Sequence, residues 1–369
     1  MRTAAQARSA ISDGLKSALW ATGALVRYHR LRNRNALTVA AFHRVLDPDD
    51  RRWAGADPLW TVSQTFFAHC LDFFQENYRV ISLADVLAAR EGARRLPRCP
   101  LLITFDDGWA DTRDYALPAL RRRGLPAALF VVTGAIGQRQ GFWQERILAA
   151  CQTGRISPSL AAEFWQRLLP GQAAPEHCAL AAGRRIVAAL AKLSPAEREE
   201  IMRRVPPVGG SCPVEIVDDA GLAELARSGV AIGTHGVSHE PLTAVDDPEA
   251  ELRNCWQDLQ RRLGKDAGLP TLSFPHGRYD RRMLELARGL GYRLMFTSER
   301  GLNRIDGNRI PDVLGRVEIT SQLCGSAGGR LDPEKLALWL FRQPHVYLCR
   351  LHHAPLHQLP PPSAPLHQQ

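Results

Sequence analysis

Residues 101–132 read LLITFDDGWADTRDYALPALRRRGLPAALFVV, and this stretch contains one complete β/α/β unit. A buried strand is predicted at Leu101–Phe105, directly after Pro100. A helix over Tyr115–Arg123 follows and ends at Gly124, and the apolar run Ala127–Val132 predicts the second strand. In such a unit the two strands lie parallel in one sheet, because a crossover helix connects them.

The same alternation of short apolar runs and helical patterns extends in both directions along the chain. Helical patterns such as Pro248–Leu263 and Arg281–Leu290 separate the apolar runs. We therefore predict an α/β fold with seven or eight parallel strands. The further strands are expected at Ala36–Phe42, Arg79–Ile81, Val230–Ile232, Thr271–Phe274, Leu294–Phe296 and Arg316–Ile319.

The strand pattern is interrupted between Gln138 and Arg227 by segments of helical period that prolines and glycines separate. We interpret residues 138–227 as a helical insertion, because the β/α alternation resumes after it; a lid or a substrate wall is a plausible role. The other expected units are a basic amphipathic N-terminal arm (1–35), the two parts of the α/β domain (36–137 and 228–325), a C-terminal helix or extension (326–353) and a disordered tail (354–369).

The net charge of the 369-residue chain is +9, and most of this excess lies near its start. Up to Asn35 the chain carries seven lysines or arginines against Asp13 alone. Gly14–Arg34 has leucines at loosely helical spacing opposite a basic face, so a helix lying on an anionic membrane is one interpretation. A solvated or packing helix is the alternative. No nucleic-acid partner is expected, because the charge is concentrated in the arm and is almost all arginine.

The cysteines and the apolar segments bear on where the protein works. The eight cysteines are dispersed with no C-x-x-C pair, which excludes a zinc ribbon and a small disulfide scaffold. We expect them to be mostly reduced and buried, which favours a cytosolic chain. The apolar stretch Ala18–Val26 is far too short to span a bilayer, and no clear cleavage site precedes Arg27. A cytoplasmic protein is predicted, with membrane association only through the arm.

Two polar motifs that follow predicted strands carry the residues of a metal site. Asp106 and Asp107 are adjacent carboxylates that repel each other unless a cation or a proton separates them, although an Asp-Gly turn is the alternative. His235 and His239 lie four residues apart, on one face of a helical turn, and can bind one ion. With Asp107 they form a set of two histidines and one carboxylate, which leaves coordination positions open for water and substrate.

Two more polar clusters come just after predicted strands. His43 follows the first strand, and the segment Ser273–Asp280 (SFPHGRYD) follows a later one. A histidine at the first position, taken alone, is more often structural. The carboxyl ends of parallel strands in a barrel converge on one face, so we expect all four clusters to meet there.

At these residues the chain resembles the polysaccharide deacetylases with the NodB homology domain, carbohydrate esterase family 4. Thr104–Gly108 and Gly233–His239 match the two metal-site motifs of that family, and Ala116–Leu120, Gly124–Ala127 and Leu242 match their surroundings. The resemblance covers roughly residues 36–319 without the insertion. It implies a distorted (β/α)7 barrel and one divalent metal ion, usually zinc, with cobalt, nickel or manganese as alternatives. It also implies that Asp107, His235 and His239 hold the ion and that Asp106 is the catalytic base.

The chain departs from the family pattern at two places. Many members carry an arginine two residues before the proline of the third motif, where this chain has Ser273, and the aromatic that follows that proline is here His276. No late Leu-x-His follows Arg316–Ile319; instead Phe42–Val45 resembles the Tyr-His-x-Val element of the exopolysaccharide branch, which implies His43 as the general acid. Arg278 or Arg316 is expected to orient Asp106. Substrate contacts are expected from Trp109, Phe274, Pro275, His276, Arg278 and Arg316.

The reaction that the resemblance implies is removal of N-acetyl groups from an N-acetylhexosamine-containing polysaccharide or lipid-linked glycan. One alternative is a catalytically weak homologue that only binds glycan, which the departures at Ser273 and His276 suggest. Another is an O-deacetylase on the same fold. An iron-dependent oxygenase also uses two histidines and a carboxylate, but it normally has a different, all-β scaffold.

Overall fold

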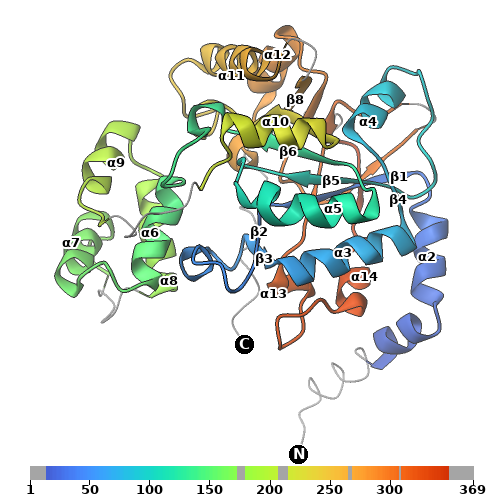
Figure 1. Ribbon diagram of the computed structural model, residues 1–369, viewed down its shortest axis with the longest axis horizontal. Coiled ribbons are helices and arrows are strands. Elements are labelled where there is room, and N and C mark those ends of the chain that lie inside the picture. The colour runs from blue at the N-terminus through green and yellow to red at the C-terminus, as the bar shows by residue number, and fades with distance from the viewer. Residues whose placement is uncertain (1–13, 173–178, 207–214, 265–267, 307–308, 349–369) are drawn as a thin grey trace, which may run out of the picture.

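A mostly parallel sheet forms the centre of the molecule (Figure 1). The computed structural model describes residues 14–172, 179–206, 215–264, 268–306 and 309–348. Strands that pair in parallel run across the sheet in the order β11 (Val313–Leu314), β9 (Leu294–Phe296), β8 (Gly268–Ser273), β7 (Val230–Thr234), β6 (Ala127–Val131), β5 (Pro100–Phe105) and β1 (Ala36–Phe42). These strands lie where the apolar runs predict them, except β11, which the sequence pattern missed.

The segment 313–318 connects the two ends of this parallel series. β11 pairs with β9, whereas β12 (Val317–Glu318) pairs in parallel with β1. Only Gly315 and Arg316 separate β11 from β12, so the two short strands act as one interrupted strand. Among the described residues the parallel strands therefore follow one another around seven positions, from β1 back to β1.

Shorter strands extend this arrangement at its edges. β4 (Arg79–Val80) pairs in parallel with the start of β5, and β10 (Leu302–Arg304) pairs antiparallel with β1. β13 (His345–Val346) pairs with β10. β2 (Arg44–Leu46) and β3 (Thr61–Ser63) form a separate parallel pair beyond the carboxyl end of β1.

Side chains along the central strands alternate between an inner hydrophobic core and outer cores that the covering helices share. On β1, Leu37 and Val39 pack with Leu102 and Phe296 of other strands, whereas Phe42 lies in the core that the covering helices share. The same alternation continues past the strand ends. His43 therefore lies on the same face of the sheet as Leu37, and Asp106 lies on the same face as Leu102. Strand register thereby turns the polar residues after different strands toward one point.

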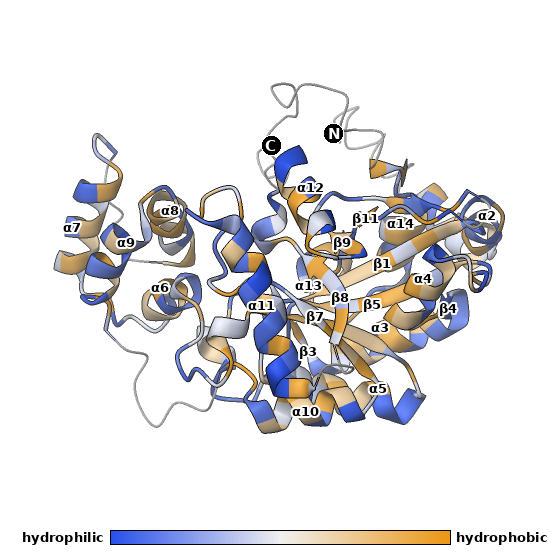
Figure 2. Ribbon diagram, turned by 90° about the horizontal axis from the view of Figure 1, so that it is seen from above, coloured by the Kyte–Doolittle hydropathy of each residue, from blue (hydrophilic) through white to orange (hydrophobic). Residues whose placement is uncertain are grey.

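Helices cover the outer faces of the sheet, and their hydrophobic residues gather toward it (Figure 2). Most of these helices have a side-chain cap at their N-terminus; at α4 (Leu83–Arg90), for example, Ser82 and Asp85 form reciprocal hydrogen bonds. In chain order they are α3 (Gln64–Asn77), α4 (Leu83–Arg90), α5 (Leu117–Arg123), α10 (Asp219–Arg227), α11 (Pro248–Leu263), α12 (Arg281–Gly289), α13 (Ser321–Cys324) and α14 (Pro333–Phe341).

The helical insertion has a hydrophobic core of its own. It consists of α6 (Trp143–Gln152), α7 (Pro158–Leu168), α8 (Leu180–Leu190) and α9 (Pro195–Met202), which project from one side of the sheet (Figure 1). This core ends at Val205, earlier than the expected boundary at residue 227. Leu222 and Leu225 of α10 pack in the core of the sheet instead. The expected boundary was too late because helical period alone does not show which core a helix faces.

The second half of the N-terminal arm is part of the domain, which corrects the expectation of an arm outside it. In α2 (Ala24–Arg32), Leu25 and His29 are buried. The His29 ring lies 4.5 Å from the Tyr78 ring and 4.1 Å from the Phe341 ring, and Asn33 donates to the Phe341 carbonyl at 2.9 Å. These contacts dock α2 between α3 and α14. Leucine spacing did not reveal them, because a histidine and an asparagine make them.

The remaining expectations about the chain ends concern exposed or undescribed residues. Leu15 and Leu19 are exposed. The membrane contact expected of the arm stays a prediction for the residues before α2. Residues 1–13 and the expected disordered tail at 354–369 lie outside the described residues. In the described ranges, no helix is both long and apolar enough to cross a membrane. Cys70, Cys99, Cys255 and Cys324 are buried thiols, as expected.

Truncation should separate the two parts of the arm. Deletion of residues 1–35 is expected to lower the free energy of unfolding by roughly 3 kcal/mol or more, since it removes a buried leucine and the hydrogen bonds of His29 and Asn33. Deletion of residues 1–22 should cost less, because most of these described side chains are exposed and Trp20, which stacks on Phe73, is only partly buried. Urea unfolding of both variants measures the difference, and equal stabilities would contradict the docking of α2.

Candidate active site

Asp106 and Asp107 lie directly after β5, and both are buried. The chain turns sharply here, with φ of 75° at Asp107 and 88° at Gly108. A non-glycine residue rarely adopts this left-handed conformation, so surrounding contacts must hold it. The Asp107 carbonyl accepts from the Val132 amide at 3.4 Å, and the Gly108 carbonyl accepts from the Val217 amide at 2.8 Å.

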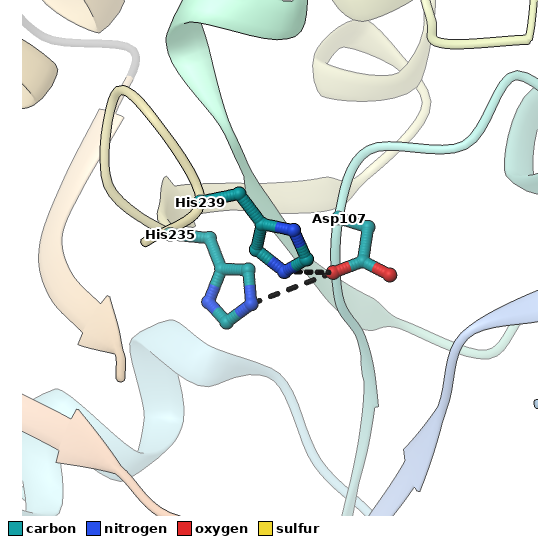
Figure 3. A group of neighbouring side chains, drawn as sticks. All are labelled: Asp107, His235 and His239. Carbon is teal, nitrogen blue, oxygen red and sulfur yellow. Dashed lines mark ion pairs between the residues drawn. The ribbon is translucent and has the colours of Figure 1, made fainter. Parts of the chain in front are cut away.

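Asp107, His235 and His239 come together as one cluster (Figure 3). Nε2 of His235 lies 3.4 Å and Nε2 of His239 lies 3.3 Å from Asp107 Oδ1. One candidate ligand atom from each of the three residues lies within 4.8 Å of the other two. Each residue was predicted as a metal ligand from its motif, and the fold brings all three to one point.

The donor atoms of this cluster fit a divalent cation. His235 Nδ1 donates to the Ser273 carbonyl at 2.8 Å, and this hydrogen bond directs its Nε2 toward Asp107. Imidazole nitrogens with one carboxylate oxygen are a donor set that zinc and related transition metals accept. Burial opposes ionisation of Asp107, but the neighbouring His239 and His235 outweigh it and hold the pKa of this carboxyl well below its usual range.

Arg316 pairs with the second carboxylate, Asp106. Its two terminal nitrogens donate to Oδ1 at 2.8 Å and to Oδ2 at 2.6 Å, and its Nε donates to the Thr297 carbonyl at 3.1 Å. Ser273, at the place where many family members carry an arginine, donates to Asp106 Oδ2 at 3.3 Å. Burial disfavours the charged carboxylate, yet Arg316 and then His235 hold the pKa of Asp106 below its ordinary value. Asp106 is therefore ionised at neutral pH.

His43 lies after β1, with a carboxylate on one side and an aromatic ring on the other. Its Nδ1 is 3.2 Å from Glu318 Oε1, and its ring lies 4.6 Å from the half-exposed ring of Trp60. Burial alone lowers the pKa of His43, but Glu318, with Asp107 and Asp106, raises it to about 9. The imidazole is therefore protonated at neutral pH.

The sequence missed Glu318 and Trp60 as neighbours of His43. Glu318 stands on a strand that was predicted, but a two-residue strand gives no signal of which way its side chains point. Trp60 precedes a short strand that the sequence pattern did not reveal.

Several of the expected substrate contacts have buried side chains. Trp109 is 1% exposed, Phe274 is fully buried and Pro275 is buried, so contact of these three side chains with substrate stays a prediction. Arg316 is also buried and holds Asp106. Phe274 follows β8 and packs with Leu272 on the outer face of the sheet. A motif match does not show which way a side chain points.

His276 and Arg278 are the expected substrate contacts that stay exposed. His276 stacks on the His239 ring at 4.7 Å and donates from Nε2 to the His239 carbonyl at 3.0 Å. The structure shows no contact between Arg278 and Asp106, so of the two arginines proposed to orient this carboxylate, Arg316 is the one placed to do so.

Glu145, in the first turn of α6, is a half-buried acid that the sequence did not indicate. Its Oε2 is closed off from solvent and has no hydrogen-bond partner among the described residues. Burial and then the charge of Asp107 raise the pKa of Glu145 to about 8. The insertion had no motif, so nothing singled out this residue before its place in the fold was known.

Comparison with known proteins agrees with this geometry. The family model described as polysaccharide deacetylase matches residues 93–177 and 181–295. The Bacillus subtilis (strain 168) protein YxkH is 26% identical over 102 residues, which are 27% of this chain and 36% of YxkH, so the match spans about a third of that relative.

Solved structures with the same fold share little sequence with this chain. IcaB from Ammonifex degensii has a TM-score of 0.52 at 18% identity, covering 83% of this chain and 97% of IcaB. The Streptococcus pyogenes deacetylase PplD, solved in complex with acetate, has a TM-score of 0.51 at 17% identity, covering 83% and 98%. These likenesses and the strand order confirm the predicted fold class, the distorted (β/α)7 barrel of the polysaccharide deacetylase type.

The matched model extends over both metal-site motifs and over more than half of the chain. The residues that the model covers include Asp106, Asp107, His235 and His239, which the fold gathers at the carboxyl ends of β5 and β7, on either side of β6. The chain belongs to the polysaccharide deacetylase family.

Proposed function

We propose that the protein is a metal-dependent hydrolase that removes N-acetyl groups from an N-acetylhexosamine-containing polysaccharide or lipid-linked glycan. One observation carries this proposal: a carboxylate, Asp106, held by Arg316 and a histidine, His43, held by Glu318 adjoin the Asp107, His235 and His239 cluster. Hydrolysis of an amide needs a base for water and an acid for the departing amine, and this arrangement supplies both. PplD, which shares the fold, was solved with acetate, the acid that deacetylation releases.

Asp107, His235 and His239 would hold the metal ion, most suitably zinc. Such an ion, when bound, lowers the pKa of its water from about 15.7 toward 7 and polarises the acetyl carbonyl. Asp106 is the base that accepts the proton of the attacking water. Its pairing with Arg316 fixes the carboxylate in one orientation and keeps it ionised at the working pH.

His43 is the general acid that protonates the amine as the bond to the acetyl carbon breaks. An amine departs far more readily when it is protonated than as an amide anion. Glu318 contacts Nδ1, which orients the ring and leaves Nε2 as the nitrogen able to face the substrate. Trp60, exposed beside this ring, offers an apolar surface against which a sugar can pack.

Replacement of His43 and of Glu318 should separate proton donation by His43 from the effect of Glu318 on the pKa of His43. His43→Ala is expected to lower kcat roughly 100- to 10 000-fold with metal content retained, since it removes the general acid. Glu318→Gln should instead move the alkaline limb of the pH–rate profile to lower pH, because Glu318 raises the pKa of His43, to which Asp106 and Asp107 also contribute. Rates measured from pH 5 to 10 provide both readouts. An unshifted limb in Glu318→Gln would contradict the tuning role.

The proposed function is tested by measuring acetate release from N-acetylhexosamine oligomers. Protein loaded with zinc or cobalt should release acetate, and protein treated with a chelator should not until metal is restored. Binding of oligomers without release would indicate the glycan-binding homologue, and release from O-acetylated sugars alone would indicate an esterase. Either result overturns the proposal.

A further inference from the structure

Trp109 is a buried side chain whose polar atom contacts the metal-site cluster. Its Nε1 donates to Asp107 Oδ2 at 2.9 Å. The other carboxylate oxygen, Oδ1, is then the one that faces His235 and His239. The hydrogen bond therefore selects which oxygen points at the cation position. It also helps to hold a residue whose backbone has an unfavourable positive φ.

The Trp109 ring is itself fixed from one face by Arg44. The guanidinium carbon of Arg44 lies 4.0 Å from the ring centroid. Two carboxylates anchor that guanidinium: Asp111 accepts from Nε at 2.8 Å and Glu215 accepts from a terminal nitrogen at 2.7 Å. Arg44 is 4% exposed, so this ion pairing is shielded from solvent. The residue next to His43 in the chain thus supports the Trp109 ring.

Phe142, at the start of the helical insertion, touches both Trp109 and a metal-site histidine. Its ring meets the Trp109 ring edge-on at 5.4 Å and lies 4.3 Å from the His239 ring. His276 stacks on the same imidazole at 4.7 Å, so His239 is enclosed by two rings. Like Asp107, His239 has a positive φ, 64°, which makes its position dependent on such packing.

We infer that Trp109 and Phe142, supported by Arg44, form an aromatic clamp that positions two of the three metal ligands, Asp107 and His239. The inference rests on the proposed function only in taking this cluster as a metal site. It assigns the start of the insertion to the metal centre, since Phe142 immediately precedes α6. The clamp residues are positioning residues, because they reach the ion only through its ligands.

Trp109→Phe removes the indole N–H and keeps an aromatic ring, so it tests the hydrogen bond most directly. We expect its dissociation constant for zinc to rise roughly 10- to 100-fold, as loss of a ligand's hydrogen-bond partner usually costs. The constant is measured on full-length protein by competition with a chromophoric chelator. The absorption spectrum of the cobalt-loaded variant should also change, because the carboxylate can rotate.

Trp165→Phe is the matched control. Trp165 is another buried tryptophan whose Nε1 donates to an oxygen, the Gln172 carbonyl at 3.0 Å, but it lies in the core of the insertion. This variant should lose comparable stability while its zinc affinity and cobalt spectrum stay unchanged. Phe142→Leu, which removes the contacts to both rings, should weaken zinc binding several-fold.

The outcomes separate this inference from the proposed function. If folded Trp109→Phe binds zinc as tightly as the unaltered protein, or if Phe142→Leu leaves zinc affinity unchanged, the clamp is overturned while the metal site stands. If the unaltered protein binds neither zinc nor cobalt, the proposed function itself fails. Equal losses of zinc affinity in Trp109→Phe and Trp165→Phe would show a general loss of structure and would also overturn the clamp.

Discussion

Asp106→Asn is expected to lower acetate release roughly 100- to 10 000-fold while the metal content stays at the level of the unaltered protein. The amide of asparagine has almost the same shape as the carboxylate but cannot accept the proton of the attacking water. Asp107, His235 and His239 are untouched by the change, so the protein should still bind metal. Metal analysis and acetate release on the same sample give both quantities.

The pairing of Asp106 with Arg316 makes a stability control necessary. Removing one partner of a buried ion pair typically costs about 3–5 kcal/mol, because the other charge stays buried without compensation. Thermal unfolding must therefore show that Asp106→Asn is folded at the assay temperature. Asp50→Asn is a suitable control, since Asp50 also accepts from an arginine, Arg52, at 2.7 Å but lies outside the proposed site. Near-normal turnover in folded Asp106→Asn would remove this residue as the base.

His239→Ala should act differently, because it removes a ligand and not the base. Only Asp107 and His235 would be left to hold the ion. Loss of a ligand's hydrogen-bond partner lowers metal affinity roughly 10- to 100-fold, and loss of the ligand itself should lower it further. Acetate release should fall with the metal content. Inductively coupled plasma spectrometry of the dialysed protein measures the metal-to-protein ratio.

His69→Ala is the control for this variant. His69 lies on α3, is exposed and is not part of the cluster, so its replacement should leave both metal content and activity unchanged. An unaltered metal-to-protein ratio in His239→Ala would contradict the assignment of His239 as a ligand. Metal loss in both variants would point to adventitious binding by histidines.

The sequence predicted the residues whose signal is local. Asp106, Asp107, His235 and His239 each follow a strongly apolar run, and parallel strands bring their carboxyl ends to one face. The partners of these residues were harder to predict. Arg316, one of the two arginines expected to orient Asp106, reaches it across 210 positions of the chain, and the apolar pattern marked the strand after Arg316 but not β11 before it.

Side-chain direction was the main thing that the sequence could not supply. Trp109 stands next to the motif and was expected to touch substrate, yet it is buried and donates to Asp107. The helical period of residues 138–227 indicated helices there but not the core on which each packs, and α10 packs on the core of the sheet. Whether Phe142 faces solvent or His239 depends on how the insertion returns to the barrel, which its own residues do not show.

The most direct test of this account is the ratio of free amine to acetate produced by the metal-loaded protein from an N-acetylhexosamine oligomer. Hydrolysis of an acetamide releases one primary amine on the glycan for each acetate. We predict equal yields of the two products, both abolished by chelation and both restored by zinc or cobalt. Acetate without amine, or product formation that survives complete removal of metal, would contradict the account.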